Sequence, residues 1–421
     1  MALRNFTRLA VVDVTPLREV PGYRWLFAGM LFMHAGRQLT VVAVPFQVYA
    51  LTGSTLMVGL LGLAQLIPLL AVSLIGGALA DAVDRRRLLF LSQMLLAATA
   101  FGLLWNSATA APSVWPLFVL SGINAGVSAI DGPARHALVP GLVGRELLPS
   151  ALALNQTLAN TAKAAVPALG GLLIALAGLP VSYGTEALMF LISGLLLTRL
   201  PDSRIEGGGR KFGLDSIAEG FRFLRPRKLI QATFLLDLNA MVFGMPTALF
   251  PAFGTVTLGG DAFTVGLLYA APGIGALIGA VTSGWVSSVR KQGRAVILAI
   301  IGWGLAIAVF GLSKSVVLAV VMLGVAGAAD VVSAIFRQAI VQLTIPDAVR
   351  GRLSSMHMAV VAGGPRLGEL EAGLVASLTS VRFSVISGGL ACILGTFAIA
   401  RWSPRILAYE YDPGRQGSEQ P

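Results

Sequence analysis

Two stretches of the chain match each other at an offset of 207 positions, Gly53-Ser-Thr-Leu-Met-Val-Gly-Leu-Leu61 and Gly260-Asp-Ala-Phe-Thr-Val-Gly-Leu-Leu268. A second match, at an offset of 202 positions, joins Arg135-His-Ala-Leu-Val139 and Arg337-Gln-Ala-Ile-Val341. Both offsets are close to half of the 421 residues. The sequence therefore predicts two halves that repeat one fold, each running through the same elements in the same direction.

The composition places the chain in a membrane. Asp, Glu, Lys and Arg make up 12% of the residues, about half of the usual quarter, whereas 56% are hydrophobic and the mean hydropathy is +0.80. A soluble core cannot bury so many apolar side chains, so we expect an all-α membrane protein.

The same composition excludes several other classes. Cys392 is the single cysteine, so no intramolecular disulfide forms, and the three histidines are too far apart in the sequence for a metal site. The chain has no phosphate-binding lysine loop, and its net charge of +11 comes from short scattered clusters. We therefore expect neither an enzyme, a metal protein nor a nucleic-acid-binding protein.

A helix needs about 20 apolar residues to cross the ~30 Å hydrocarbon layer of a membrane. Twelve such stretches are predicted, at 23–50, 56–79, 88–106, 113–136, 148–178, 180–200, 229–251, 263–286, 295–312, 316–340, 352–378 and 381–402. We predict an N-terminal bundle at 1–200, a cytoplasmic linker at 201–228, a C-terminal bundle at 229–402 and a tail at 403–421. Within the linker, residues 214–224 have the apolar spacing of an amphipathic helix, with a plain charged linker as the alternative.

The distribution of basic residues predicts the orientation. With both termini in the cytoplasm, 26 of the 31 Lys and Arg residues fall in the tails, in cytoplasmic loops or at adjoining helix ends. Arg4, Arg8 and Arg18 precede a first apolar run that has no small-residue cleavage site. We therefore expect this first helix to stay in the protein.

The loop between the second and third spans contains Gly77-Ala-Leu-Ala-Asp81-Ala-Val-Asp-Arg85-Arg86-Arg87. It resembles the cytoplasmic loop signature G-x-L-A-D-R-x-G-R-R of the major facilitator superfamily, with Ala82 and Asp84 replacing a basic residue and a glycine. We expect Asp81 to cap a helix N-terminus while Arg85 and Arg86 bind carbonyl groups or lipid phosphates and so hold one conformation. The alternative is ordinary positive charge on the inner side.

A second motif occurs in both halves. Val166-Pro167-Ala-Leu-Gly170-Gly171 in the fifth span is similar to the G-P-x-x-G-G motif of antiporters in this superfamily, with Val166 at its first glycine. The eleventh span repeats the pattern as Gly364-Pro365-Arg366-Leu367-Gly368-Glu369. Proline bends a helix and glycine permits close approach, so we expect both helices to flex where the halves meet. Alternatively, these are the glycines and prolines common in any membrane helix.

Further segments resemble the enterobactin exporter branch of the superfamily, among them 133–140, 142–146, 220–224 and 265–284. The resemblance implies the major facilitator fold, with twelve transmembrane helices in two pseudo-symmetric six-helix bundles, in a bacterial inner membrane. It also implies a siderophore exporter that is driven by the proton gradient and needs no cofactor, whereas related members export macrolides and other drugs. The implied partners are a small-molecule substrate and membrane lipids, and we expect a monomer.

Charged residues inside the predicted spans should face a cavity or a partner, because each costs at least ~2.5–3.5 kcal/mol to insert. There are nine, namely Arg37, Asp131, Lys163, Glu186, Asp237, Asp330, Arg366, Glu369 and Glu371. Arg37, Lys163 and Arg366 have a similar depth, and we predict that they bind an acidic substrate together with His34 and Gln38. Alternatively each base only neutralises an acid, above all Arg366, which is three positions before Glu369.

Proton coupling requires a carboxylate whose proton affinity changes when water leaves or enters. Asp237 has no basic residue within four positions, so its burial is not compensated locally, and we predict that it carries the proton. Glu369 and Asp330 are expected to share this role. Asp330 is seven positions before Arg337.

Two further acids have simpler interpretations. Asp131 is also a candidate for proton coupling, but Arg135 is four positions further on and favours a gate ion pair, with Arg337 as the matching base of the second half. Glu186 is near the outer end of the sixth span, so we expect it to reach the membrane interface.

The sequence thus predicts a proton-coupled antiporter that exports a siderophore or a similar anion by alternating access. The main alternative is a broad multidrug or macrolide efflux pump with the same fold. An uptake symporter and a non-transporting membrane sensor or scaffold are further alternatives.

Overall fold

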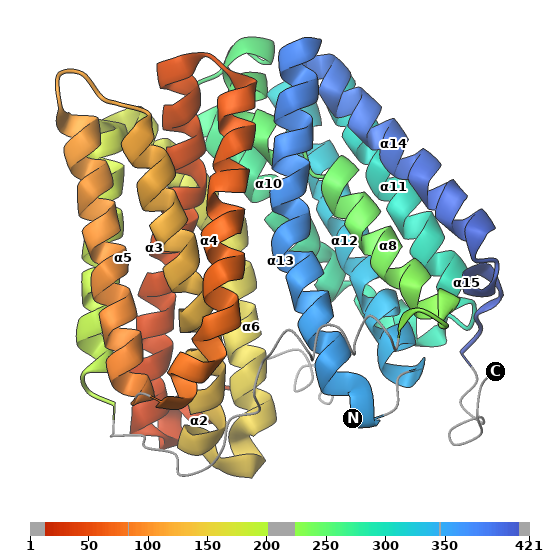
Figure 1. The fold of residues 1–421 in the computed structure, drawn as a ribbon, viewed down its shortest axis with the longest axis horizontal. Helices are drawn as coiled ribbons and strands as arrows, with labels where there is room; N and C mark the ends of the chain where they lie inside the picture. Colours follow the sequence, from red (N-terminus) through yellow and green to blue (C-terminus); the bar gives the residue numbers. More distant parts are fainter. Residues whose placement is uncertain (1–12, 83, 201–223, 345–346, 412–421) are drawn as a thin grey trace, which may run out of the picture. The chain divides into compact units, whose positions relative to one another are not determined.

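A computed structural model describes residues 13–82, 84–200, 224–344 and 347–411, with the backbone alone at 74–82 and 347–359. Every regular element in these ranges is a helix (Figure 1), as the composition predicts. The predicted amphipathic helix at 214–224 lies outside the described residues except for Leu224. The chain divides into two compact units.

The first unit comprises Met1–Val44 and Ile67–Phe212. Its helices are α2 (Thr15–Glu19), α3 (Pro21–Thr52), α4 (Thr55–Ala82), α5 (Arg85–Ala108) and α6 (Trp115–Leu197). The ends of α3 and α4 that meet at Gly53 group with the second unit, as Pro45–Leu66. Gly53 has a φ of 62°, in the left-handed region that favours glycine, and this allows the short connection.

α6 covers 83 residues, but its backbone leaves the helical conformation twice. Gly144 has φ 72° and ψ 176°, and Gly178 has φ 82° and ψ 172°. A side chain would be strained at these φ values, so glycine is needed at both turns. The resulting segments, 115–143, 145–177 and 179–197, correspond to the fourth, fifth and sixth predicted spans, although the helix also continues through 137–143.

Small residues bring α3 and the last segment of α6 close together. The hydroxyl of Ser193 donates a hydrogen bond to the carbonyl oxygen of Gly29 at 2.8 Å. A Cβ atom added to Gly36 would lie 3.2 Å from the ring of Phe190. Such close backbone approach is how apolar helices associate in lipid.

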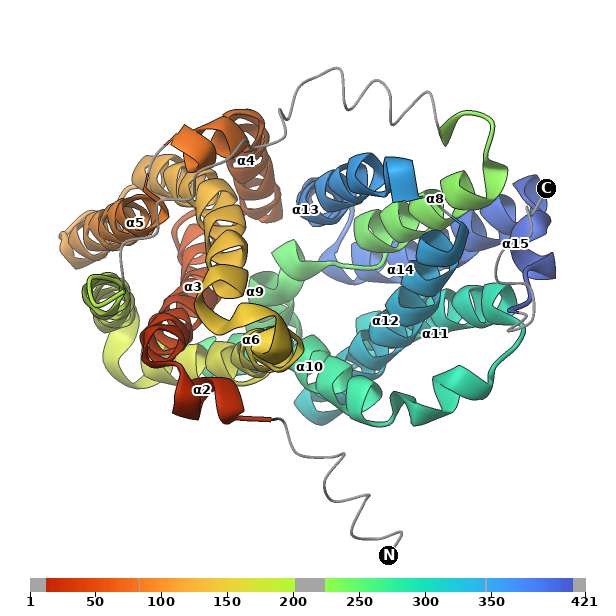
Figure 2. The same ribbon diagram turned by 90° about the horizontal axis from the view of Figure 1, so that it is seen from below.

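The second unit comprises Pro45–Leu66 and Gly213–Pro421. Its helices after the linker are α8 (Lys228–Phe243), η1 (Thr247–Leu249), α9 (Phe250–Ala252), η2 (Phe253–Thr257), α10 (Ala262–Val281), η3 (Ser283–Ser288), α11 (Gln292–Leu312), α12 (Val316–Thr344), α13 (Asp347–Leu378), α14 (Val381–Trp402) and α15 (Arg405–Ala408). α12 packs against both α10 and α11 (Figure 2), and α11 also packs against α14.

The seventh span is not one regular helix. α8 ends at Phe243, and after Gly244-Met245-Pro246 the chain continues as the short turns η1, α9 and η2. Proline has no N–H to continue a helix. The indole N–H of Trp303 donates to the carbonyl oxygen of Gly244 at 2.8 Å, so the carbonyl at the break is satisfied inside the protein, as a membrane requires.

An aromatic cluster holds these short turns against α11. The ring centroids of Phe253 and Phe310 are 4.3 Å apart, and Phe250 meets Phe310 edge-on at 6.0 Å. All three side chains are buried. Aromatic pairs of this kind add specific geometry to the apolar packing of a core.

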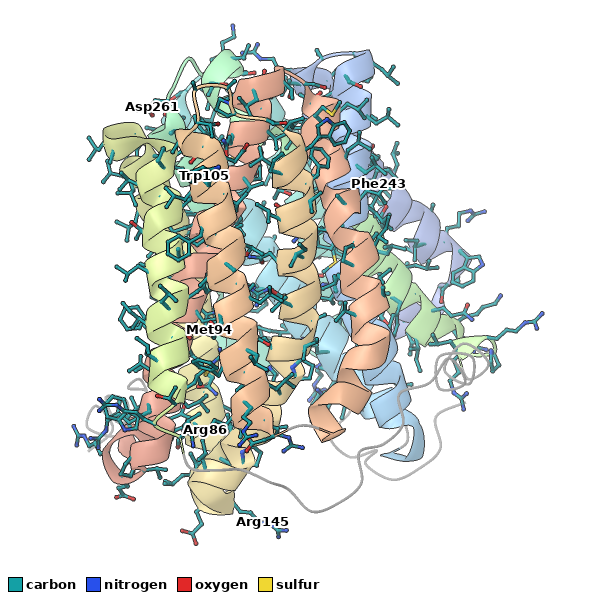
Figure 3. The ribbon with its side chains drawn as sticks, turned by 60° about the vertical axis from the view of Figure 1, so that its left-hand side comes forward. Arg86, Met94, Trp105, Arg145, Phe243 and Asp261 are labelled. Atoms are coloured by element: carbon teal, nitrogen blue, oxygen red, sulfur yellow. The ribbon has the colours of Figure 1, made fainter. Side chains whose placement is uncertain are left out.

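Nine helical stretches in the described part of the chain are long and apolar enough to cross a membrane. Counting α6 as its three segments and adding α13 is consistent with the twelve predicted spans. In Figure 3, Arg86 and Arg145 lie at one end of the first unit and Trp105 lies at the other. The two arginines mark the end that the predicted orientation places in the cytoplasm.

Candidate functional site

A buried ion pair lies in the first unit. Arg135 Nε donates to Asp131 Oδ2 at 2.7 Å, and Gln93 Nε2 on α5 donates to Asp131 Oδ1 at 2.9 Å. The Arg135 and Asp131 side chains are only 5% and 2% exposed. Because the pair has no net charge and is hydrogen-bonded, it can stay in an apolar interior. The ion pair that the spacing predicts is therefore present, and its gating role stays a prediction.

The second unit has a buried pair of the same chemistry, contributed by two helices. Arg337 Nη2 on α12 lies 2.7 Å from Asp237 Oδ1 on α8, and both side chains are almost fully buried. The same nitrogen lies 3.8 Å from Asp330 Oδ1, whose side chain is 40% exposed. The sequence around Asp237 is therefore misleading, because the compensating base comes from a helix far along the chain.

The two halves differ in the source of the acid. Ser333 takes the place in the second half that Asp131 has in the first, at the offset of 202 that relates Arg337 to Arg135. Arg337 Nη1 donates to Ser333 Oγ at 2.6 Å. In the second half, one arginine thus lies between two carboxylates, whereas in the first half one arginine is paired with one carboxylate.

Several predicted substrate-binding residues lie together in the first unit. The charges of Arg37, Asp131, Arg135 and Lys163 all act on the ring of His34. Lys163 is exposed, and Arg37, His34 and the neighbouring Gln38 are partly buried. This region has the excess of positive charge that an acidic ligand requires.

Arg366 belongs to the second unit, where it pairs with Glu369. Arg366 Nη1 lies 3.0 Å and 3.1 Å from the two carboxylate oxygens. The hydroxyl of Thr247 donates to Glu369 Oε1 at 3.3 Å, and the hydroxyl of Tyr269 donates to the carbonyl oxygen of Thr247 at 3.0 Å. The base does neutralise the acid, as the alternative interpretation holds, and the pair is anchored to the break in the seventh span.

Glu186 is fully buried, so the expectation that it reaches the membrane interface is wrong. The hydroxyl of Thr40 on α3 donates to Glu186 Oε1. Hydropathy alone does not distinguish the lipid-facing side of a helix from a side that packs on another helix, which explains the error.

The loop motif binds carbonyl groups of neighbouring helix segments. Asp84 caps α5 by accepting from the backbone N–H of Arg86 at 2.9 Å, whereas the side chain of Asp81 lies outside the described residues. Arg85 Nη1 donates to the carbonyl oxygen of Ala137 at 3.2 Å. Arg86 Nη2 donates to the carbonyl oxygen of Thr198. The arginines thus tie the start of α5 to α6 and to the residue that follows it.

The residues expected to flex the helices all lie inside α6 or α13, namely Pro167, Gly170, Gly171, Gly364, Pro365 and Gly368. A Cβ atom on Gly368 would lie 2.5 Å from the carbonyl oxygen of Met241 at the end of α8. One on Gly170 would lie 2.9 Å from the side chain of Leu39. The glycines are therefore needed for close helix packing, and the flexing role stays a prediction.

Sequence reasoning missed the neutral partners of the acids, namely Thr40, Gln93, Thr247 and Tyr269. No sequence signal singles them out, because uncharged polar residues are common in membrane helices and each partner is defined only by its contact. Within the described ranges, no group of three or more His, Cys, Asp or Glu residues is placed to hold a metal ion.

A cavity of about 610 Å³ lies elsewhere in the second unit. Its lining includes Tyr49, Thr55, Thr257, Ser380 and Arg382. None of the predicted site residues lines it. The predicted residues are thus defined by their ion pairs and hydrogen bonds rather than by this cavity.

Residues 12–413 match the family described as transmembrane secretion effector. The chain is 30% identical over 390 residues to the enterobactin exporter EntS of Citrobacter koseri, which covers 91% of this chain and 92% of that one. It is 31% identical over 394 residues to the enterobactin exporter EntS of Shigella boydii serotype 18, covering 92% and 94% of the two chains.

Solved structures share the fold at low identity. The nucleoside transporter NupG is 15% identical with a TM-score of 0.72, covering 90% of this chain and 98% of that one. A bacterial homolog of the human lysosomal transporter Spinster is 13% identical with a TM-score of 0.73, covering 95% of this chain and 100% of that one. At these identities the likeness is one of fold.

Apolar membrane-crossing helices, an internal repeat and ion pairs buried in both halves define a multi-pass membrane transporter with the major facilitator fold. The chain belongs to the transmembrane secretion effector family of that superfamily, whose members are transporters and not enzymes. It moves a small molecule across a membrane.

Proposed function

We propose that this transporter exports an anionic siderophore or a similar acidic small molecule in exchange for protons. The relatives named as enterobactin exporters support this class of cargo. The positive charge around His34, Arg37 and Lys163 supports an acidic ligand. The proposal places the protein as a monomer in the bacterial inner membrane, with both termini in the cytoplasm.

The observation that carries the proton coupling is the position of Arg337 between Asp237 and Asp330. One guanidinium nitrogen lies 2.7 Å from the first carboxylate and 3.8 Å from the second. A proton on Asp237 removes the stronger attraction, and the guanidinium then pairs with Asp330 instead. Arg337 therefore has two arrangements that differ by one bound proton, which is the two-state element that coupling requires.

In this mechanism the N-terminal bundle (1–200) and the C-terminal bundle (229–402) move so that the proposed substrate-binding residues are exposed to each side of the membrane in turn. Protonation favours one facing state and disfavours the bound anion there. By reciprocal linkage, the anion lowers the affinity for the proton to the same extent. Outward movement of the cargo then accompanies inward movement of protons.

The test is uptake of labelled enterobactin into everted membrane vesicles with an acidic interior. We expect accumulation that a protonophore abolishes, compared with vesicles that lack the protein. Accumulation that survives the protonophore contradicts the proton coupling. Uptake of lipophilic cations in place of enterobactin favours the multidrug alternative, and transport in the opposite direction favours a symporter.

A further inference from the structure

The contact between α3 and the last segment of α6 follows a regular antiparallel register. Gly29 meets Ser193, Gly36 meets Phe190, and Thr40 meets Glu186. As the residue number rises along α3, it falls along α6. We call this contact the α3–α6 seam, and Glu186 is its ionisable member.

Glu186 differs from the other buried acids of the described residues. Its Oε1 accepts a hydrogen bond from Thr40, while its Oε2 is buried with no hydrogen-bond partner among the described residues. Asp131 and Asp237 are each held by an arginine, whereas no cation of the described part of the chain forms an ion pair with Glu186. As far as the described residues go, the seam thus holds a carboxyl group that has no counter-charge.

The groups around Glu186 do not compensate a negative charge. Tyr183, one turn earlier on α6, is fully buried and interacts electrostatically with Glu186. α5 packs against α6, and its charged residues are the three arginines at its start. On α3, His34 interacts electrostatically with Arg37, Arg135, Asp131 and Lys163, and Glu186 is not among these groups. An ionised carboxylate in this position is therefore costly, and a proton bound at Oε2 removes the charge while Oε1 keeps its hydrogen bond.

We propose that Glu186 is a second proton-binding site of the transporter, protonated while the α3–α6 seam is closed and deprotonated when the seam opens to water. On opening, the O–H bond at Oε2 breaks and the proton passes to a water molecule. The carboxylate that remains is stabilised by water and by the Thr40 hydroxyl. This inference rests on the proton exchange proposed above and adds a site in the first unit.

The position of the seam connects this proton to the region of positive charge. Arg37 is three residues before Thr40 on the same helix, so it lies beside the side of α3 that contacts Glu186, whereas His34 lies farther around the helix. A helix moves as a rigid element. Opening the seam therefore displaces Arg37, one of the cations that are proposed to bind the anion.

The experiment measures protons released when enterobactin is added to purified transporter in weakly buffered solution. Glu186→Gln keeps the size of the side chain and an oxygen that accepts from Thr40, but it has no proton to release. We expect the release to fall by about one proton per transporter, because a carboxyl group carries one. Glu146→Gln, which changes an exposed acid of the same unit, is expected to release as many protons as the wild type.

The outcomes separate this inference from the proposed function. If the wild type releases no protons, proton exchange itself is rejected. If the wild type and Glu186→Gln release equal numbers of protons, the exchange stands and Glu186 is only a structural residue.

Infrared spectroscopy gives a second readout that does not depend on transport. We expect a carboxylic C=O band in the wild type that is missing from Glu186→Gln. Thr40→Val keeps the acid and removes its hydrogen bond, so the same band should shift without disappearing. If neither variant changes the band, the assignment of the band to Glu186 is contradicted. Thr40→Val provides this test even if Glu186→Gln folds poorly.

Discussion

Arg337 Nη2 lies 2.7 Å from Asp237 Oδ1, although 100 positions separate the two residues in the sequence. The contact joins α12 to α8 inside the second unit, and both side chains are almost fully buried. Because the charges compensate each other only as a pair, removing either one leaves the other buried and unpaired. The pair therefore contributes to stability as well as to the proposed coupling.

Asp237→Asn is expected to abolish uptake driven by a pH gradient in everted vesicles. Breaking a buried pair costs ~3–5 kcal/mol, and the nearby Asp330 should keep the loss toward the lower end, as measured by thermal unfolding of the purified protein. Asp330→Asn is the matched control. Its side chain is 40% exposed and lies 3.8 Å from the guanidinium, so its effect on stability should be smaller. Full pH-driven uptake by Asp237→Asn removes that residue from the coupling mechanism.

Lys163→Gln is expected to raise the KM for enterobactin about tenfold, since a charged hydrogen bond contributes ~1.5–3 kcal/mol and Lys163 is exposed. Arg37→Gln should have an effect in the same direction. Lys314→Gln removes an exposed lysine from the second unit and should leave the KM unchanged. An unchanged KM in both test variants rejects the recognition of an anion by these cations.

Gly327→Ala is expected to destabilise the second unit. A Cβ atom at this position would overlap the carbonyl oxygen of Pro272, so α12 and α10 would have to separate. Overpacking of this kind costs ~1–3 kcal/mol, which thermal unfolding would detect. Gly302→Ala on α11 is the control, because its Cβ would meet nothing within 4 Å. Equal unfolding temperatures for the two variants contradict the close packing of α10 and α12.

Trp303→Phe is expected to weaken the structure at the break in the seventh span. The variant keeps an aromatic ring but leaves the carbonyl oxygen of Gly244 without its 2.8 Å hydrogen bond from the indole. An unsatisfied buried group costs ~1–3 kcal/mol. Hydrogen exchange should therefore become faster at 245–250, whereas α14 should be unaffected. Unchanged exchange at the break would show that the indole bond is dispensable.

Sequence patterns succeed where one local property decides the structure. Hydropathy locates the spans because any helix in lipid must present apolar side chains over its whole length. The i, i+4 spacing predicts the pair of Asp131 and Arg135, since both residues lie on one helix face. The break after Phe243 is harder to predict from the sequence, because glycine and proline, the residue types at 244 and 246, also occur in continuous membrane helices.

Glu186 and Asp237 show where such patterns fail. Neither residue has a basic neighbour within four positions, so the sequence describes both as acids without local compensation. In the folded units, Asp237 is paired with Arg337 from another helix, whereas the partner of Glu186 among the described residues is the hydroxyl of Thr40 alone. Two acids with similar sequence surroundings therefore have opposite electrostatic environments.

The sequence by itself determined the helical class, the membrane environment, the internal repeat and the residues whose charge must be accommodated, because hydropathy and chain length act on each helix separately. Only the tertiary structure decided which charges meet, which face of α6 is buried, and where the seventh span breaks. The physical reason is that the energy of a charge in an apolar interior depends on the atoms within a few ångströms of it, and residues distant in the sequence contribute those atoms.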